Sequence, residues 1–167
     1  MNKIQVIHDS VVYARVDAIV NAANSALMAG GGVCGAIFQA AGHDKLTAAC
    51  RAIGHCDTGN AVITPGFGCK AKYIIHAVGP IYSGRPRDAQ LLASVYRSCL
   101  DRAEEKGLTS IGLCSISTGI FGYPLEDAAR IAMDVLKTYP TRSLTDIRLY
   151  CYGDREYQVY AALAGEV

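Results

Sequence analysis

The chain has 167 residues, a length at which one compact domain is the default expectation. Hydrophobic residues make up 51% of the chain and charged residues 19%, a composition that excludes a disordered or coiled-coil protein. Sixteen Lys and Arg against fifteen Asp and Glu leave a formal charge of +1. A protein that grips nucleic acid through its phosphates needs clustered cations, so we expect no nucleic-acid partner.

The seven cysteines are an odd number without a CxxC pair, which is typical of free thiols in a reducing compartment. The first ten residues, MNKIQVIHDS, hold too short an apolar stretch for a signal peptide. No apolar run approaches the roughly 18 residues that a membrane span requires. We therefore expect a cytoplasmic protein that is a monomer and has no membrane partner.

The predicted elements alternate between strands and helices along the whole chain. Short β-branched runs and apolar periodicity predict, in chain order, strands at 4–7 and 16–20, helices at 36–41 and 46–53, strands at 61–64 and 73–78, a helix at 89–106, a strand at 110–115, a helix at 125–137, a strand at 146–151 and a helix at 156–163. This alternation predicts a single α/β domain over 1–167, with a mixed, mostly parallel sheet between helices on both faces.

Two glycine-containing loops each lead into a predicted helix. GGGVCG occupies 30–35, and STGIFG, at 117–122, lies between a predicted strand and a helix. Glycine lets the backbone approach a ligand closely, and the free N–H groups of a helix N-terminus favour an anion. Ligands of such sheets bind outside the carboxyl ends of the strands, so two such loops suit a diphosphate. Tight turns without a ligand are the alternative.

Other interpretations of the same region are weaker. Gly30, Gly32 and Gly35 also spell the GxGxxG of dinucleotide-binding domains, but that motif directly follows a strand, and here residues 24–29 intervene. A Walker A loop is excluded because no GK[ST] occurs. A zinc site would draw on four residues whose spacing fits no common pattern: His43, Cys50, His55 and Cys56. We expect neither a metal nor a cofactor.

Two further features lie outside these loops. His76 sits inside an apolar predicted strand, which favours a hydrogen-bonded core residue over a catalytic one. The run Arg85-Pro86-Arg87 falls in a predicted loop, where a plain surface turn is favoured over a contact with a substrate protein.

VDAIVNAANSALMAGGGV, at 16–33, and SISTGIFGYP, at 115–124, closely resemble the macrodomain family, in particular its MacroD-type ADP-ribosyl hydrolases and O-acetyl-ADP-ribose deacetylases, the Appr-1"-p processing branch. CDTGNAVIT, at 56–64, and AKYIIHAVGPIY, at 71–82, extend the likeness over almost the whole chain. The resemblance implies a three-layer α/β/α macrodomain that holds ADP-ribose in a cleft at the strand ends. The implied partners are ADP-ribose, an ADP-ribosylated protein or O-acetyl-ADP-ribose.

The resemblance also implies a role for each matching residue. Asp9, with Ser10 beside it, would accept a hydrogen bond from the adenine amino group, since a carboxylate is only an acceptor. Asn24 would bond the distal ribose, because an amide both donates and accepts; a turn-capping asparagine is the alternative. Tyr152 would pack on adenine. The two phosphate loops would consist of Gly31, Gly32, Val33 and Cys34, and of Ser117, Thr118, Gly119, Ile120 and Phe121.

The match breaks where hydrolytic members usually carry an acid after GGGV and then Ala-Ile-His. Cys34 stands at the position of the acid, which the family's proposed mechanism uses to orient or activate water, and Phe38 stands at that of the histidine. Cys34 is then a small filler in a loop that hydrolyses slowly with Asn24 and the ligand's phosphate positioning water, or a thiolate nucleophile, or the mark of a domain that only binds.

The sequence therefore predicts a protein that binds ADP-ribose and hydrolyses ADP-ribosyl esters, with Asn24 and Cys34 as the candidate catalytic residues. The alternative is a non-catalytic ADP-ribose-binding module. An NAD-dependent oxidoreductase is disfavoured by the position of the glycines. Neither loop contains Lys or Arg, so we expect backbone N–H groups and helix N-termini to supply most of the contacts to a diphosphate.

Overall fold

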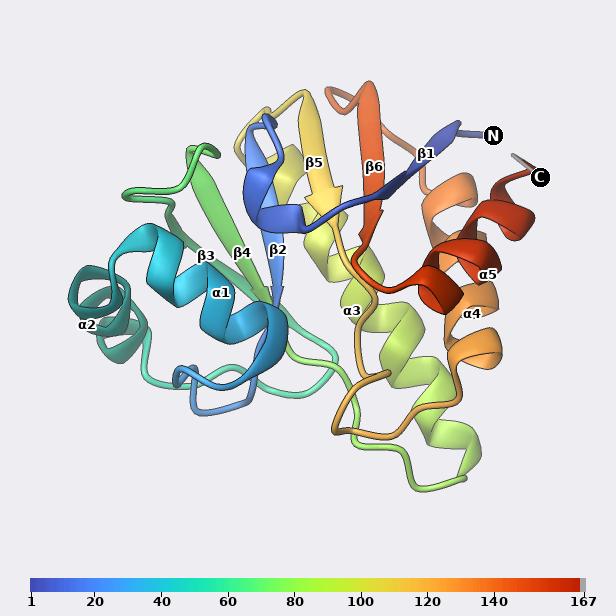
Figure 1. Ribbon diagram of the computed structural model, residues 1–167, viewed down its shortest axis with the longest axis horizontal. Helices are drawn as coiled ribbons and strands as arrows, with labels where there is room; N and C mark the ends of the chain where they lie inside the picture. Colours follow the sequence, from blue (N-terminus) through green and yellow to red (C-terminus); the bar gives the residue numbers. More distant parts are fainter. Residues whose placement is uncertain (166–167) are drawn as a thin grey trace.

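The computed structural model describes residues 1–165, and the end of the predicted domain, 166–167, lies outside the described part. Six strands form one sheet there (Figure 1): β1 (Ile4–His8), β2 (Ala18–Ala22), β3 (Ala61–Pro65), β4 (Tyr73–Ala77), β5 (Ser110–Leu113) and β6 (Asp146–Cys151). The helices are a short 3-10 turn, η1 (Val11–Tyr13), and α1 (Gly32–Ala41), α2 (His43–Ile53), α3 (Pro86–Glu105), α4 (Leu125–Thr138) and α5 (Asp154–Ala164).

The sheet is mixed and mostly parallel, which confirms the predicted fold class. Its strand order is β1-β6-β5-β2-β4-β3, and each neighbouring pair is parallel except β3 with β4. From β2 the chain passes to β3 and β4 on one side, and it then crosses to β5 and β6 on the other. The topological switch therefore falls between β2 and β5, the place where open α/β sheets bind ligands.

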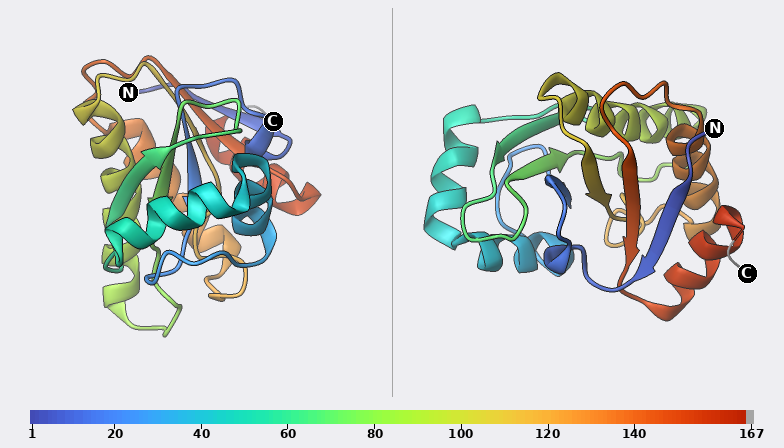
Figure 2. Two further views of the ribbon diagram at one scale, coloured as in Figure 1. Left: turned by 90° about the vertical axis from the view of Figure 1, so that its left-hand side faces the viewer. Right: turned by 90° about the horizontal axis from the view of Figure 1, so that it is seen from above.

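Helices cover both faces of the sheet and enclose two apolar cores. Phe38 of α1 and Leu46 of α2 are buried in the core on one face. Leu92 of α3, Leu136 of α4 and Tyr160 of α5 are buried in the core on the other. Figure 2 shows α1 and α2 on the opposite side of the sheet from α3, while α5 packs against α4 and the edge strand β1. No helix within residues 1–165 is long and apolar enough to cross a membrane.

Strand β2 differs from its predicted range at both ends, and side-chain hydrogen bonds explain the difference. It begins two residues later than predicted because the Asp17 carboxylate turns to the start of β5, where it accepts the N–H groups of Thr109 and Ser110. The Thr109 N–H in particular lowers the pKa of Asp17. The strand then continues through Asn21, which is buried and pairs with His76 of β4, so a polar residue extends an apolar strand.

Candidate functional site

A cleft of about 950 Å³ opens at the carboxyl ends of the parallel strands, beside the switch between β2 and β5. The structure brings all of the predicted contact residues together there, although they come from loops that follow four different strands. They are Asp9, Ser10, Asn24, Gly31, Gly32, Val33, Cys34, Ser117, Thr118, Gly119, Ile120, Phe121 and Tyr152. The volume falls at the upper end of the range for small-molecule sites in proteins.

The first glycine loop turns directly into α1 at the edge of the cleft. The helix begins at Gly32, four residues earlier than predicted, with Gly31 as its N-cap and no side chain capping it. Gly32 has a φ of +57°, a left-handed conformation that would strain any residue with a side chain. Because the first N–H groups of a helix have no partner within the helix, those of Gly32, Val33 and Cys34 are available to an anion.

The second loop is held at both ends by backbone hydrogen bonds. The Tyr123 N–H donates to the carbonyl of Ser117 over 2.9 Å, and the Tyr82 N–H donates to the carbonyl of Phe121 over 2.9 Å. Between these anchors Ile120 is fully exposed. Within residues 1–165, the N–H groups of residues 118–120 donate to no other group of the protein. The loop therefore presents three backbone donors beside the cleft, as a phosphate-binding loop requires.

Ser117 carries the most unusual conformation of this loop. Its φ is +70°, a left-handed value that is uncommon outside glycine, and its side chain is buried. Its hydroxyl has no hydrogen-bond partner in the described residues. Gly79, after β4, makes room for it, because a Cβ at Gly79 would lie 2.2 Å from Ser117 Oγ. A buried, unpaired hydroxyl costs free energy, so Ser117 Oγ is a candidate partner for a ligand in the cleft.

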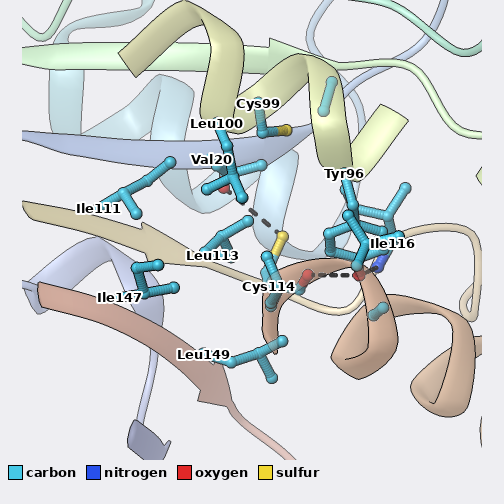
Figure 3. Packing of buried hydrophobic residues seen from close by; sticks show 14 of the residues in the cluster. Val20, Tyr96, Cys99, Leu100, Ile111, Leu113, Cys114, Ile116, Ile147 and Leu149 are labelled. Carbon is cyan, nitrogen blue, oxygen red and sulfur yellow. Dashed lines mark hydrogen bonds between the residues drawn. The ribbon is translucent and has the colours of Figure 1, made fainter. Parts of the chain in front are cut away.

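Two buried tyrosines hold the chain between β5 and this loop. The Tyr96 hydroxyl, from α3, donates to the Cys114 carbonyl over 2.9 Å and accepts the Ile116 N–H over 2.9 Å (Figure 3). Tyr160, from α5, places its hydroxyl 2.8 Å from Ser115 Oγ, which in turn lies 2.8 Å from Thr118 Oγ1. A chain of hydroxyl groups therefore links helix α5 to the second loop.

Asn24 lies in the cleft wall, and its side-chain amide already forms two hydrogen bonds with the backbone of Met28. Its Nδ2 donates to the Met28 carbonyl over 2.9 Å, and its Oδ1 accepts the Met28 N–H over 3.0 Å. This pair closes the loop after β2, in which Leu27 has a φ of +58°. Asn24 is thus a turn-capping residue, and one N–H and one lone pair of its amide remain for a ligand. The turn-capping role is therefore observed, and the contact of Asn24 with a ribose stays a prediction that this geometry leaves room for.

Cys34 lies in the first turn of α1 and is only 6% exposed. Its Sγ is 3.8 Å from the same Met28 carbonyl. No histidine or carboxylate within residues 1–165 lies within hydrogen-bond distance of this thiol, so the structure provides no base for a nucleophile. Phe38, one turn later, is 1% exposed and belongs to the core, so it does not replace the family's histidine in the cleft.

The far end of the cleft carries the predicted adenine contacts. Asp9 is exposed just after β1, and its Oδ1 accepts the Ser10 N–H over 2.7 Å. Ser10 caps η1 through a hydrogen bond from the Val12 N–H to its Oγ. Tyr152, after β6, is 82% exposed. An aromatic ring left in solvent beside a carboxylate acceptor suits a flat base with an amino group.

The sequence prediction missed one acidic residue of the cleft, Glu156. Its Oε1 accepts the Tyr152 N–H over 3.2 Å, and burial raises the pKa of its carboxyl group. The predicted helix begins at this residue, whereas α5 begins at Asp154 after the N-cap Gly153. Glu156 is therefore the third residue of the helix. A Glu three positions after an N-cap often turns back toward the backbone before the helix, and this spacing could have identified Glu156 from the sequence.

Three buried polar side chains from β2, β3 and β4 are joined by hydrogen bonds. Thr64 Oγ1 donates to the Pro65 carbonyl over 3.1 Å, so it accepts the Nε2–H of His76 over 2.9 Å. His76 Nδ1 then accepts from Asn21 Nδ2 over 3.1 Å. Burial lowers the pKa of His76 to about 4. His76 is thus a neutral, hydrogen-bonded core residue, as the sequence predicts.

The charge in the cleft is unusual for an anion site. Its walls contain two acids, Asp9 and Glu156, and the described lining holds no Lys or Arg. The groups that favour an anion are the backbone donors of the two loops and the N-terminus of α1. Elsewhere in residues 1–165, no three His, Cys, Asp or Glu side chains gather in a way that would hold a metal ion.

Known proteins with similar sequences cover the chain almost completely. A macro domain protein of Caldanaerobacter subterraneus is 46% identical over 164 residues, which are 95% of this chain and 94% of the relative. The O-acetyl-ADP-ribose deacetylase of Salmonella gallinarum is 44% identical, with 97% of this chain and 94% of the relative covered.

Solved structures show the same fold. The Oceanobacillus iheyensis macrodomain with ADP superimposes with a TM-score of 0.90 at 34% identity, covering 99% of this chain and 94% of that one. The Trypanosoma brucei macrodomain in complex with ADP-ribose gives a TM-score of 0.91 at 37% identity, covering 98% and 69%. The family model for the macro domain matches residues 20–132, which include both glycine loops. The chain therefore belongs to the macro domain family.

Proposed function

We propose that the protein binds ADP-ribose in this cleft and hydrolyses ADP-ribosyl esters, either on acidic residues of modified proteins or in O-acetyl-ADP-ribose. The observation that carries the proposal is the pair of loops, 31–34 and 117–121, which line one cleft with free backbone N–H groups. Two sets of such donors suit the two phosphates of ADP-ribose. Asp9 and Tyr152 at the far end suit its adenine.

The hydrolytic part of the proposal rests on Asn24 and on the relatives. The amide keeps one donor and one acceptor beside Cys34, enough to orient a ribose hydroxyl and a water molecule. Relatives that match over nearly the whole chain are named O-acetyl-ADP-ribose deacetylases. Cys34 acts in this scheme as a small filler, because its thiol is buried and directed at the Met28 carbonyl.

A non-catalytic ADP-ribose-binding module is the second candidate. It is favoured by the first turn of α1, which contains no acidic residue, and by the absence of a histidine or carboxylate partner for Cys34 within residues 1–165. A water molecule in such a site has no protein base to remove its proton.

Calorimetric titration of the protein with ADP-ribose and with NAD tests the binding step. We expect ADP-ribose to bind and NAD to bind more weakly, because the nicotinamide would occupy the space beside Asn24 and Cys34. Tight binding of NAD without binding of ADP-ribose would overturn the proposal and favour an oxidoreductase.

Release of ADP-ribose from a protein modified on acidic residues, and of acetate from O-acetyl-ADP-ribose, tests the hydrolytic step. We expect the wild type to be active and Asn24→Ala to lose about tenfold in rate, the magnitude of one lost hydrogen bond to a positioned group. Cys34→Ser should retain activity, because the thiol is not the nucleophile. An inert wild type with an active Cys34→Asp variant would establish the binding module instead.

A further inference from the structure

A second groove lies on the other side of the second loop from the cleft. It has a volume of about 490 Å³ and is formed by the segments that enter α3 and α4. In Figure 1 these two segments run side by side at the lower edge of the molecule. Two arginines line the groove, Arg85 at the N-cap of α3 and Arg130 on the exposed face of α4. Arg85 belongs to the Arg-Pro-Arg run that the proposed function leaves unexplained.

Neither guanidinium in this groove has a partner in the part of the chain that the structure describes. Within residues 1–165, the side chains of Arg85 and Arg130 form no hydrogen bond and no ion pair. Three other arginines of the protein are paired: Arg102 with Glu105, Arg148 with Asp146, and Arg155 with Glu126. The two cations in the groove are therefore free to bind an anionic group from outside.

Two acids lie near these arginines, and only one of them, Asp127, lines the groove. Asp88, in the first turn of α3, is buried and accepts the N–H groups of Ser83 and Gly84 over 2.8 and 2.9 Å, which lowers its pKa. Asp127 also lines the groove, as the third residue of α4, and forms no ion pair in the described residues. Among the residues that line the groove, two cations stand against one acid, whereas the lining of the cleft holds two acids and no cation.

The groove is continuous with the second loop. Tyr82, in the groove wall, donates its N–H to Phe121 of the loop over 2.9 Å. Tyr123, in the same wall, donates its N–H to Ser117, and its ring lies 4.9 Å from that of Tyr82. The segment 117–123 thus separates the cleft from the groove, so a chain that leaves the cleft over this loop meets the exposed Tyr82 and then the arginines.

We propose that this groove binds an acidic segment of the protein that carries the ADP-ribose group, close in sequence to the modified residue. The inference rests on the proposed function, since it needs a modified protein in the cleft. Guanidinium groups bind carboxylates through paired N–H donors, and the exposed ring of Tyr82, which packs on the buried Tyr123, offers an apolar surface for the peptide between its charges. The groove would therefore select protein substrates by the charge around the modified position, whereas O-acetyl-ADP-ribose would not reach it.

Two peptides that carry ADP-ribose on the same central side chain test this inference. In both, an amide to the distal ribose replaces the ester, so that the link resists hydrolysis; one peptide has Glu at the flanking positions and the other has Gln. Affinity is measured by competition against a fluorescent ADP-ribose probe. We expect the Glu peptide to bind the wild type about three- to tenfold more tightly, the range for two exposed ion pairs.

Variants locate the effect. Arg85→Gln with Arg130→Gln should remove the preference for the Glu peptide and leave the affinity for free ADP-ribose unchanged. Asp127→Asn should increase the preference. Arg97→Gln is the matched control, because Arg97 is an exposed, unpaired arginine of the same helix, about 18 Å along it from Arg85. It should keep the wild-type preference.

The outcomes separate this inference from the proposed function. Equal affinity of the wild type for the two peptides, or a preference that Arg97→Gln abolishes as fully as the double variant does, would overturn the acidic-segment groove alone. A wild type that binds neither peptide nor free ADP-ribose would overturn the proposed function, and the inference with it. A preference that survives in the double variant would place the charge recognition elsewhere on the surface.

Discussion

The Met28 carbonyl is the point where the two candidate catalytic side chains meet. It accepts a hydrogen bond from Asn24 Nδ2 and lies 3.8 Å from Cys34 Sγ. A thiol donates weakly to a carbonyl, whereas a carboxylate in the same rotamer would face that oxygen with like partial charge. An acid at position 34 must therefore turn toward the cleft, where a water molecule can bind it. This is why Cys34→Asp is an informative variant rather than a simple restoration.

Gly31 and Gly35 of the first loop differ in the space around a would-be side chain, and alanine substitutions distinguish the two positions. A Cβ at Gly35, inside α1, would lie 2.6 Å from the Gly30 carbonyl, whereas one at Gly31, with φ of −87°, would meet nothing within 4 Å. We expect Gly35→Ala to lower the free energy of unfolding by about 1–3 kcal/mol, the cost of overpacking. This reverses the usual gain from Gly to Ala within a helix.

Urea denaturation of the two alanine variants measures the difference. Gly31→Ala is the matched control and should change the free energy of unfolding by less than about 0.5 kcal/mol, as most unstrained surface substitutions do. A Gly35→Ala variant as stable as the wild type would show that the Gly30 carbonyl moves away without penalty.

At the scale of elements, two helices set the conformation of the second loop. Tyr96 of α3 holds Cys114 and Ile116, and Tyr160 of α5 holds Ser115 and through it Thr118. Burial raises the pKa of both tyrosines, so both hydroxyls stay protonated and keep a hydrogen to donate. The loop is thereby ordered before any ligand arrives, which spares a ligand the entropy of ordering it.

Tyr160→Phe should therefore weaken ADP-ribose binding by about three- to tenfold, because Thr118 loses the far end of its hydroxyl chain. Tyr139→Phe is the control: the Tyr139 hydroxyl donates to Asp101 Oδ1 over 2.5 Å, and neither residue lines the cleft. Both variants should lose stability, and only Tyr160→Phe should lose affinity in calorimetric titration. Equal affinity of the two variants would show that the loop holds its conformation without the chain of hydroxyls.

Helices with a regular apolar spacing could be predicted from the sequence. The ends of elements that depend on a particular side-chain hydrogen bond were predicted less well. The six residues whose spacing predicts α3 are all buried: Leu92, Val95, Tyr96, Cys99, Leu100 and Ala103. Helix α5 begins two residues before its predicted start, so Glu156 lies within its first turn, where its carboxylate accepts the Tyr152 N–H. The contact of Asn24 with Met28 depends on the left-handed backbone at Leu27, and no propensity predicts that conformation for leucine.

For the whole molecule, the cleft and the groove differ in the charged groups that they offer to a ligand. The cleft sits at the switch between β2 and β5 and offers backbone donors with two acids and no cation in its described lining. The groove offers two free arginines. The net charge of +1 therefore says little about the local charge of the cleft or of the groove. A protein without a large positive charge can still bind a dianion, because backbone N–H groups supply the donors.

Stability of the whole fold should depend on pH through His76. Its pKa is lowered to about 4 in the folded protein, against about 6.5 in an unfolded chain. Between these values the unfolded chain binds a proton that the folded protein does not, so stability decreases as pH falls from 6.5 to 4, by up to about 3 kcal/mol. Glu156 acts in the opposite direction, because its raised pKa lets the folded protein take up a proton first as pH falls.

Comparison with a variant isolates the contribution of His76. His76→Gln keeps a donor for Thr64 and an acceptor for Asn21 but cannot titrate, so urea denaturation at pH 7, 5.5 and 4 should show a smaller loss of stability than in the wild type. His55→Gln, which changes an exposed histidine paired with Asp57, should keep the wild-type dependence. If His76→Gln and the wild type lose the same free energy between pH 7 and pH 4, the acid sensitivity of the fold arises from its carboxyl groups, such as Asp17 and Glu104 with their lowered pKa values, and not from the buried imidazole.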